Sequence, residues 1–342
     1  MTIESHSRSL STSRLFCVLA LAACNGTTSY LDATGRAGRS EARLGTWLTV
    51  VACVVVLFVC VAIVLGIVRN RRHGDGGGGL VERQSIKGGL SWIYIGTGIT
   101  IVVLCIVFAG TMTTLTAASH PPVTPSLTLD VTGHQWWWEV TYSDASSDQL
   151  GFTTANEIHL PVGVPVRVRL HSVDVIHSFW LPQIAGKTDV IPGQVNEMWL
   201  QADRPGISRG MCAEYCGLQH ATMALAVTAE SPAAFNQWAQ TRRAESRPPT
   251  TNEAQVGQTL FIRSCGACHA VAGTPALGRY APDLTHFASR PTIGAGALDN
   301  TPQNLARWIH NAPGVKEGAR MPAMPLDASE LQAVVQYLEG LR

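Results

Sequence analysis

The chain has 342 residues, enough for two or three domains, with 46% hydrophobic residues, 14% charged residues and a formal net charge of +1. A net charge this close to zero gives no indication of a nucleic-acid partner. The nine cysteines lie in ligand-like pairs, in apolar runs and in a signal-like segment, a usage typical of metal and cofactor binding and not of a disulfide framework.

The N-terminal segment has the pattern of an export signal. Arg8 and Arg14 precede the apolar run 15–23, which is too short to span a bilayer. We therefore predict a signal peptide over residues 1–23 and an extracytoplasmic segment over 24–45. The sequence Leu-Ala-Ala-Cys at 21–24 resembles the bacterial lipobox, which makes Cys24 the predicted lipid anchor. The alternative is an ordinary signal peptide with a chance cysteine.

Two uncharged stretches are long enough to form membrane-spanning helices, over residues 46–68 and 90–115. The short loop between them, 69–89, contains five basic residues and a glycine-rich stretch. By the positive-inside rule this loop is cytoplasmic, and the regions before and after the hairpin lie outside. The sequence therefore predicts a protein of the bacterial plasma membrane, in contact with lipid, whose N- and C-terminal regions are extracytoplasmic.

Residues 120–241 have the pattern of an all-β domain, a sandwich or a barrel. Turn residues separate short runs rich in Val, Leu, Trp and Thr. Within 164–171, aliphatic residues alternate with Pro, Arg and His, the period of a half-buried strand. A short helix follows near 232–240. The predicted strands are 126–132, 136–142, 156–160, 164–171, 197–201 and 222–229.

One stretch of this domain carries a dense set of metal ligands. Cys212, Cys216, His220 and Met223 lie within twelve residues. Sulfur and imidazole donors select copper or zinc, and a thioether favours copper, since a zinc site has no use for methionine. His177 is the best candidate for a second imidazole. A disulfide between the two cysteines is the alternative, but it leaves the spacing of His and Met unexplained.

The spacing C-x-E-x-C-x-x-x-H-x-x-M, preceded by His-Ser-Phe at 177–179, resembles the dinuclear copper A loop of cytochrome c oxidase subunit II. The aromatic run at 133–138 and the segment 186–194 are similar to segments of the same family. The similarity covers roughly residues 45–230. It implies a cupredoxin-like fold with the copper ligands on two neighbouring loops at one end.

The resemblance also implies a role for each ligand. Cys212 and Cys216 would bridge two copper ions, His177 and His220 would each bind one, and Met223 would be a weak axial ligand.

Two further residues have roles implied by the resemblance. The carbonyl of Glu214 would be the second axial ligand, and its carboxylate would bind a magnesium ion facing the catalytic subunit. Trp136 would be the exposed point at which electrons enter from cytochrome c. Residues 120–241 carry a net charge of −6, which suits a basic redox partner. His134, His159 and His171 are interpreted as structural or surface residues.

The C-terminal region follows a polar linker, residues 242–252, and is predicted to bind haem. Cys265-Gly-Ala-Cys268-His269 is the attachment signature of c-type haem, with thioether bonds from both cysteines and the histidine as an iron ligand. A thioredoxin-like site is the alternative. It would not require His269, and it expects a βαβ setting that the pattern lacks.

Residues 253–342 resemble a small class I cytochrome c. Helices are predicted over 256–263, 301–310 and 329–338. The resemblance implies that Met321 is the sixth iron ligand, with Met324 as the reserve, and that the carbonyl of Pro282 accepts a hydrogen bond from the ring of His269. We assign no role to His286 and His310.

Together these features resemble subunit II of a cytochrome-c-fused haem–copper oxidase. The resemblance implies a multidomain membrane protein: a two-helix transmembrane hairpin, an all-β cupredoxin-like domain and an all-α class I cytochrome c domain. Electrons from cytochrome c or a cytochrome bc complex would pass through haem c and copper A to subunit I, beside subunit III. There dioxygen reduction is coupled to proton translocation, so this chain has no catalytic residue of its own.

Three alternatives are weighed against this hypothesis. A quinol oxidase subunit II shares the hairpin and the β domain, but that family lacks the copper ligands. A nitric oxide reductase carrying copper A differs only in its catalytic partner. A copper-delivery lipoprotein would have no use for a covalent haem.

Overall fold

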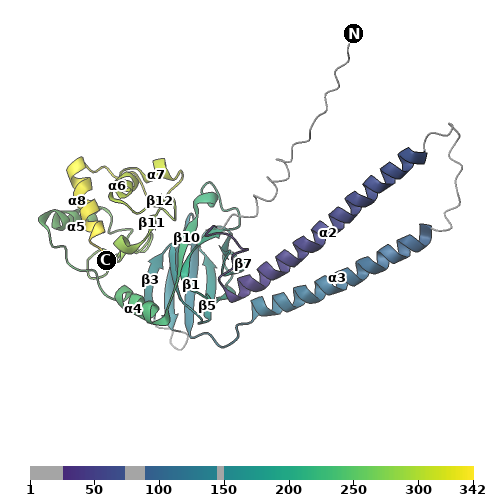
Figure 1. Cartoon of the computed structure of the whole chain (residues 1–342). Helices are drawn as coiled ribbons and strands as arrows, with labels where there is room; N and C mark the ends of the chain where they lie inside the picture. The colour runs from purple at the N-terminus through teal and green to yellow at the C-terminus, as the bar shows by residue number, and fades with distance from the viewer. Residues whose placement is uncertain (1–25, 74–88, 145–149) are drawn as a thin grey trace, which may run out of the picture.

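The structure is a computed structural model that describes residues 26–73, 89–144 and 150–342. A helical hairpin, a β domain and a small helical domain follow one another along the chain (Figure 1). The predicted signal peptide, Cys24 and the glycine-rich stretch lie outside the described residues.

The hairpin consists of α2 (Arg36–His73) and α3 (Gly89–Ser119), which lie side by side (Figure 1). Both are long and apolar enough to cross a membrane, over Arg36–Arg69 and Leu90–Ser119. Most of their large apolar side chains are exposed, as a hairpin whose outer surface contacts lipid requires.

Helix α2 begins well before the predicted span of 46–68. Its first turns pack on the β domain, where Ala37 and Ala42 are buried and the N–H of Gly38 donates to the carbonyl of Ile184 at 3.0 Å. The β domain is therefore attached directly to the end of the hairpin.

The β domain is a sandwich of two five-stranded sheets, so the predicted all-β class is confirmed. One sheet has the order β3-β2-β1-β5-β8 and the other β4-β10-β9-β6-β7. The pairs β1–β5 and β4–β10 are parallel and the other pairs are antiparallel. The strands are β1 (Leu127–His134), β2 (Trp137–Asp144), β3 (Leu150–Ala155), β4 (Glu157–Pro161), β5 (Val166–Ser172), β6 (His177–Leu181), β7 (Ala185–Val190), β8 (Asn196–Leu200), β9 (Gly206–Cys212) and β10 (Ala224–Glu230).

The alternating sequence of β5 places one face in the core. Val166, Val168 and Leu170 are fully buried between the sheets, whereas Arg167 points outward and pairs with Glu197 at 2.7 Å. All six predicted strands are present, but β3, β6, β7 and β9 were not predicted. Strand β9, for example, contains two glycines and an arginine, and forms because β10 and β6 pair with it.

The helical domain has a core of its own, formed by residues of α5, α6 and α8 with the loops between them. Helix α4 completes the sandwich. The four predicted helices correspond to α4, α5, α6 and α8. The elements are α4 (Pro232–Arg242), α5 (Asn252–Ser264), η3 (Phe287–Ser289), β11 (Thr292–Ile293), β12 (Leu298–Asp299), α6 (Pro302–His310), α7 (Ala312–Val315) and α8 (Ala328–Glu339).

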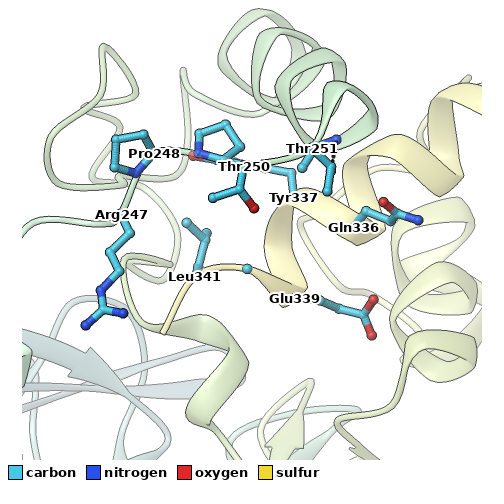
Figure 2. Close-up of a pocket in the computed structure, with 11 residues that line it drawn as sticks. Arg247, Pro248, Thr250, Thr251, Gln336, Tyr337, Glu339 and Leu341 are labelled. Carbon is cyan, nitrogen blue, oxygen red and sulfur yellow. Dashed lines mark hydrogen bonds between the residues drawn. The ribbon is translucent and has the colours of Figure 1, made fainter.

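The linker between the domains is packed against the helical domain. Ser246 donates its N–H and its hydroxyl to the carbonyl of Ala272, at 3.1 and 2.8 Å. Pro248 and Thr250 of the linker line a cavity of about 390 Å³ together with Tyr337 and Leu341. Figure 2 shows these lining residues. None of the predicted copper or haem ligands lines this cavity, which is a gap between the linker and the C-terminal residues.

Helices α5 and α8 cross at a glycine. A Cβ on Gly257 of α5 would overlap the carbonyl oxygen of Ala333 on α8, so only glycine allows this approach. Helix α5 leads directly to Cys265, its C-terminal cap. The crossing therefore determines where the haem-attachment motif lies.

We predict that Gly257→Ala separates α5 from α8 and destabilises the helical domain by about 1–3 kcal/mol, the usual cost of overpacking. Hydrogen exchange of the α5 and α8 amides should become faster, while amides of the sandwich keep their protection. Gln255→Ala, on the exposed side of the same helix, is the matched control. Equal protection in both variants would contradict the importance of the crossing.

Candidate metal and haem sites

The predicted copper ligands lie at one end of the sandwich, where three neighbouring strands meet. Cys212 ends β9, His177 begins β6 and Met223 directly precedes β10. Two main-chain hydrogen bonds fix this junction, from Cys212 N–H to Met223 O and from Ala213 N–H to Ser178 O, both 2.9 Å long. His177 thus lies on a strand, not on the predicted loop, because it pairs with Val190 of β7.

The predicted donor atoms converge around the sulfur atoms of Cys212 and Cys216, which are 3.8 Å apart. Both cysteines are buried and free, so the disulfide alternative does not hold. The other distances are 3.9 Å from Cys212 Sγ to His177 Nδ1, 3.2 Å from Cys212 Sγ to Glu214 O, 3.7 Å from Cys216 Sγ to His220 Nδ1, and 3.8 Å from Cys216 Sγ to Met223 Sδ.

This donor set fits copper. Two sulfur atoms, two imidazoles, a fully buried thioether and a carbonyl oxygen face one small volume. His177, Cys212 and Cys216 form the group whose ligand atoms lie within 4.8 Å of one another. Soft sulfur with imidazole and a thioether is the combination that copper prefers.

Asp174 orients the imidazole of His177, a role that the sequence did not settle. The ring Nε2–H donates to Asp174 Oδ1 at 2.8 Å, which fixes the ring with Nδ1 facing Cys212. The other oxygen, Oδ2, accepts the main-chain N–H of Gln135 at 2.7 Å. The carboxylate thus joins the aromatic run to the ligand His177.

The environment of Cys212 favours its thiolate form. The hydrogen bond from the Cys216 thiol is the largest cause, and further hydrogen bonds from His177 and backbone groups help to overcome desolvation, so the pKa of Cys212 lies far below its ordinary value. Of the two thiols, Cys212 therefore ionises first, and thiolate is the form that binds metal.

Trp136 lies against the copper loop and is half-buried, which corrects the prediction that it is exposed. Its indole N–H donates to the carbonyl of Cys216 at 2.9 Å, and the side-chain amide of Gln135 donates to the same oxygen at 2.8 Å. Gly217 has a φ of +115°, and a Cβ there would lie 3.1 Å from the Trp136 ring. On its other side the ring contacts Gly318 of the helical domain, which covers it.

Trp136 also lies outside the strand in which it was predicted. Strand β2 begins at Trp137, because Gln135 and Trp136 form the two-residue turn between β1 and β2, in which His134 pairs with Trp137. Trp138 is fully buried in the sandwich core.

The haem-attachment motif forms a tight turn after α5. The N–H groups of Cys268 and His269 both donate to the carbonyl of Cys265 at 3.0 Å. The ring Nδ1–H of His269 donates to the carbonyl of Pro282 at 2.7 Å, as predicted. This bond leaves Nε2 available to iron, and burial lowers the pKa of His269, which keeps the imidazole neutral. The residues therefore fit a c-type haem.

Met321 and Met324 both pack, partly buried, against the helical core. Both thioethers lie in the segment before α8, where the sixth iron ligand is predicted. The segment that precedes Met321 reaches the copper side, since Arg320 lies 3.9 Å from Asp174.

In the part of the chain that the structure describes, the histidines without a predicted ligand role are not in the group of His177, Cys212 and Cys216. His159 pairs with Glu230 at 2.7 Å and His171 with Asp130 at 3.2 Å. His134 stacks on Trp137 with ring centroids 4.2 Å apart, and burial lowers its pKa to about 4. The ring Nε2–H of His286 donates to the carbonyl of Ala244 at 3.2 Å, and His310 is exposed.

Gln135 and Lys316 are site residues that the sequence analysis missed. Gln135 lies within the aromatic run at 133–138, which the sequence analysis singled out without giving Gln135 a role. Lys316 donates to the carbonyl of Trp136 at 2.8 Å and to that of Thr222 at 3.0 Å. Nothing in the sequence around Lys316 indicates these contacts, because main-chain carbonyls leave no mark in a sequence.

Comparison with known proteins gives a family for each domain. Residues 127–230 match the cytochrome c oxidase subunit II periplasmic domain, and residues 254–342 match cytochrome c. The chain is 40% identical over 216 residues to cytochrome c oxidase subunit 2 of Alkalihalophilus pseudofirmus, covering 63% of this chain and 61% of that protein. It is 32% identical over 229 residues to cytochrome c oxidase subunit 2 of Bacillus sp. strain PS3, covering 64% and 63%.

The chain thus spans less than two thirds of the length of these relatives. A solved structure, the periplasmic domain of subunit II of cytochrome oxidase of Bradyrhizobium japonicum, is 33% identical with a TM-score of 0.33, covering 35% of this chain and 96% of that one. The two domain matches account for both sets of ligands described above. The chain joins a periplasmic domain of the cytochrome c oxidase subunit II family to a domain of the cytochrome c family.

Proposed function

We propose that this chain is the electron-transfer subunit II of a haem–copper cytochrome c oxidase. It would pass electrons from its own haem c, through a dinuclear copper A site, to subunit I, where dioxygen reduction is coupled to proton translocation. One observation carries the proposal: the predicted copper donors converge in a buried cluster beside a docked haem-binding domain. The two domain families support the same function.

The copper ligands are assigned by this geometry and the family likeness together. Cys212, Cys216, His177 and His220 would hold the copper ions through their sulfur atoms and their Nδ1 atoms. The thioether of Met223 and the carbonyl of Glu214 would complete the ligand set as its weaker donors. Such a site would supply one-electron transfer without an open position for substrate.

The protein part of this site limits structural change during transfer. Asp174 fixes the ring of His177, and the strand junction fixes both cysteines. In the helical domain, Cys265 and Cys268 would bind haem covalently, with His269 and Met321 as iron ligands. When bound, the haem would supply a one-electron donor and the copper pair a one-electron acceptor, and transfer between them would need no covalent bond to form or break.

The partners follow from this assignment. We propose contact with subunit I and subunit III, and an outside donor, cytochrome c or a cytochrome bc complex. The exposed side chain of Glu214 is the proposed magnesium ligand facing subunit I. The hairpin would place both soluble domains outside the bacterial plasma membrane, with a possible further anchor at Cys24. No observation on the described residues favours a nitric oxide reductase or a copper-delivery protein.

Copper content tests the metal assignment. The full chain should bind two copper ions and one covalent haem, with the multi-line electron paramagnetic resonance signal of a mixed-valence pair. Cys216→Ser should lose that signal, because a hydroxyl is a poor ligand for copper. Cys60→Ser, in exposed apolar surroundings on α2, is the control and should keep both ions. A mononuclear signal in the unmodified chain would contradict the proposal.

The sixth iron ligand can be assigned by comparing two methionines. Met321→Ala should abolish the sulfur-to-iron charge-transfer band and lower the haem reduction potential, since methionine ligation raises it. Met324→Ala should preserve both. The reverse result would make Met324 the ligand.

Trp136 can be tested as part of the electron path. Trp136→Ala should slow electron transfer from haem c to copper, because the ring joins Gly318 to the Cys216 carbonyl. Both metal spectra should remain intact. Trp137→Ala, which removes a neighbouring indole stacked on His134, is the control. Unchanged kinetics in Trp136→Ala would remove this residue from the path.

A further inference from the structure

Lys316 is a buried cation at the boundary between the two soluble domains. It directly follows α7 and is only 4% exposed. Its ammonium donates to three carbonyls: Trp136 O at 2.8 Å, Thr222 O at 3.0 Å and Gly294 O at 2.8 Å. The first two belong to the sandwich, beside the copper ligands, and the third to the helical domain. Lys316 thus joins three segments that are distant in sequence.

All three donors of the ammonium group have an acceptor, which offsets the cost of removing the charge from water. Burial lowers the pKa of Lys316 to about 8, which leaves the group protonated at neutral pH. Carbonyl acceptors have fixed positions on the main chain. An ammonium group that needs three carbonyl acceptors at once finds them in one arrangement of the two domains. The main effect of Lys316 is therefore on the relative position of the domains.

The residues after Lys316 continue along the copper side. The carbonyl of Glu317 accepts a hydrogen bond from the side-chain amide of Gln219 at 3.0 Å. A Cβ on Gly318 would lie 3.0 Å from the ring of Trp136. Arg320 reaches to within 3.9 Å of Asp174. The segment 316–320 therefore packs against residues that surround the copper ligands. It leads directly to Met321.

A second set of contacts joins the domains away from this segment. Arg290, which is 8% exposed, lies 3.9 Å from the buried carboxylate of Glu157 on β4. Arg242 of α4 donates to the hydroxyl of Ser289 at 2.6 Å. The Arg290 contact on β4 and the Arg242 contact on α4 lie away from Lys316, and they therefore oppose rotation of the helical domain about the Lys316 contact.

The N–H of Ala224 donates to the carbonyl of Ala295 at 3.0 Å, next to Thr222 and Gly294, which supply two of the acceptors of Lys316.

We propose that Lys316 is a positioning residue that holds the helical domain on the sandwich in one register, with segment 316–320 seated beside the copper ligands and Trp136. Transfer from haem c to copper then takes place inside a preformed arrangement and does not wait for the domain to swing on its linker. The kinetic part of this inference rests on the function proposed above, and the docking part does not.

The main-chain N–H of Ala224 reports on docking, because its acceptor lies in the other domain. The N–H of Ala226 is the internal reference, since it donates to Asn156 O inside the sandwich at 2.9 Å. In the full chain, Lys316→Met should speed exchange at Ala224 by about tenfold or more, as local opening becomes easier, and leave Ala226 unchanged. Lys187→Met, at an exposed lysine on β7, is the control and should change neither.

Electron transfer supplies the second measurement, on the holoprotein after photoreduction of its haem. In Lys316→Met the copper and haem spectra should stay intact, while transfer becomes limited by domain motion on the order of microseconds to milliseconds. Lys187→Met should match the unmodified chain. Unchanged exchange at Ala224 together with unchanged kinetics in Lys316→Met would overturn the proposal.

A milder variant covers the case in which Lys316→Met does not fold. Gln219→Glu keeps the oxygen that accepts from Thr222 and removes only the donor to Glu317. It should speed exchange at Ala224 in the same direction, and no change would overturn the proposal. A protected Ala224 in an unmodified chain that shows no haem-to-copper transfer would contradict the proposed function and leave the docking intact.

Discussion

The pairing of β9 with its two neighbours is the constraint on which the copper site depends. Strand β9 ends at Cys212, and hydrogen bonds on either side tie that end to β6 and to the residue before β10. His177, which lies 35 positions from Cys212 in the sequence, and Met223, which precedes the next strand, are thereby brought to Cys212. Only the short loop to Cys216 and His220 has to be shaped locally. A site built mainly on paired strands holds its ligands with little freedom, which is what fast electron transfer needs.

The carbonyl of Cys216 is the point at which the copper loop meets the rest of the molecule. It accepts hydrogen bonds from both Gln135 and Trp136, so the aromatic run is held against the ligand loop. Asp174 strengthens the same connection from the other side through Gln135 N–H and His177. The helical domain then contacts Trp136 directly. The surroundings of the copper ligands and the docking surface are therefore one continuous set of contacts.

Much of this organisation could be predicted because its signals are local. The motif at 212–223 contains most of the predicted copper donors within a few residues of one another. The haem-attachment motif and the apolar spans can likewise be recognised from short stretches of sequence. The prediction of an exposed Trp136 was wrong because Gly318, which lies beside its ring, belongs to the other domain and is distant in the sequence. Strand β9 escaped prediction because tertiary pairing overrides its poor propensity. Lys316 gave no signal, since its partners are carbonyls that every residue possesses.

The packed linker changes what the domain interface has to achieve. A partner that diffuses freely must bind tightly enough to overcome its lost translational freedom, whereas residues 243–251 keep the helical domain at a high effective concentration beside the sandwich. An interface of this kind does not need a large apolar area. A few fixed polar contacts, such as those of Lys316 and Arg290, are then enough to select the orientation. Because the linker already keeps the two domains together, the interface does not have to supply binding affinity. Its contacts only have to fix the orientation of the helical domain on the sandwich.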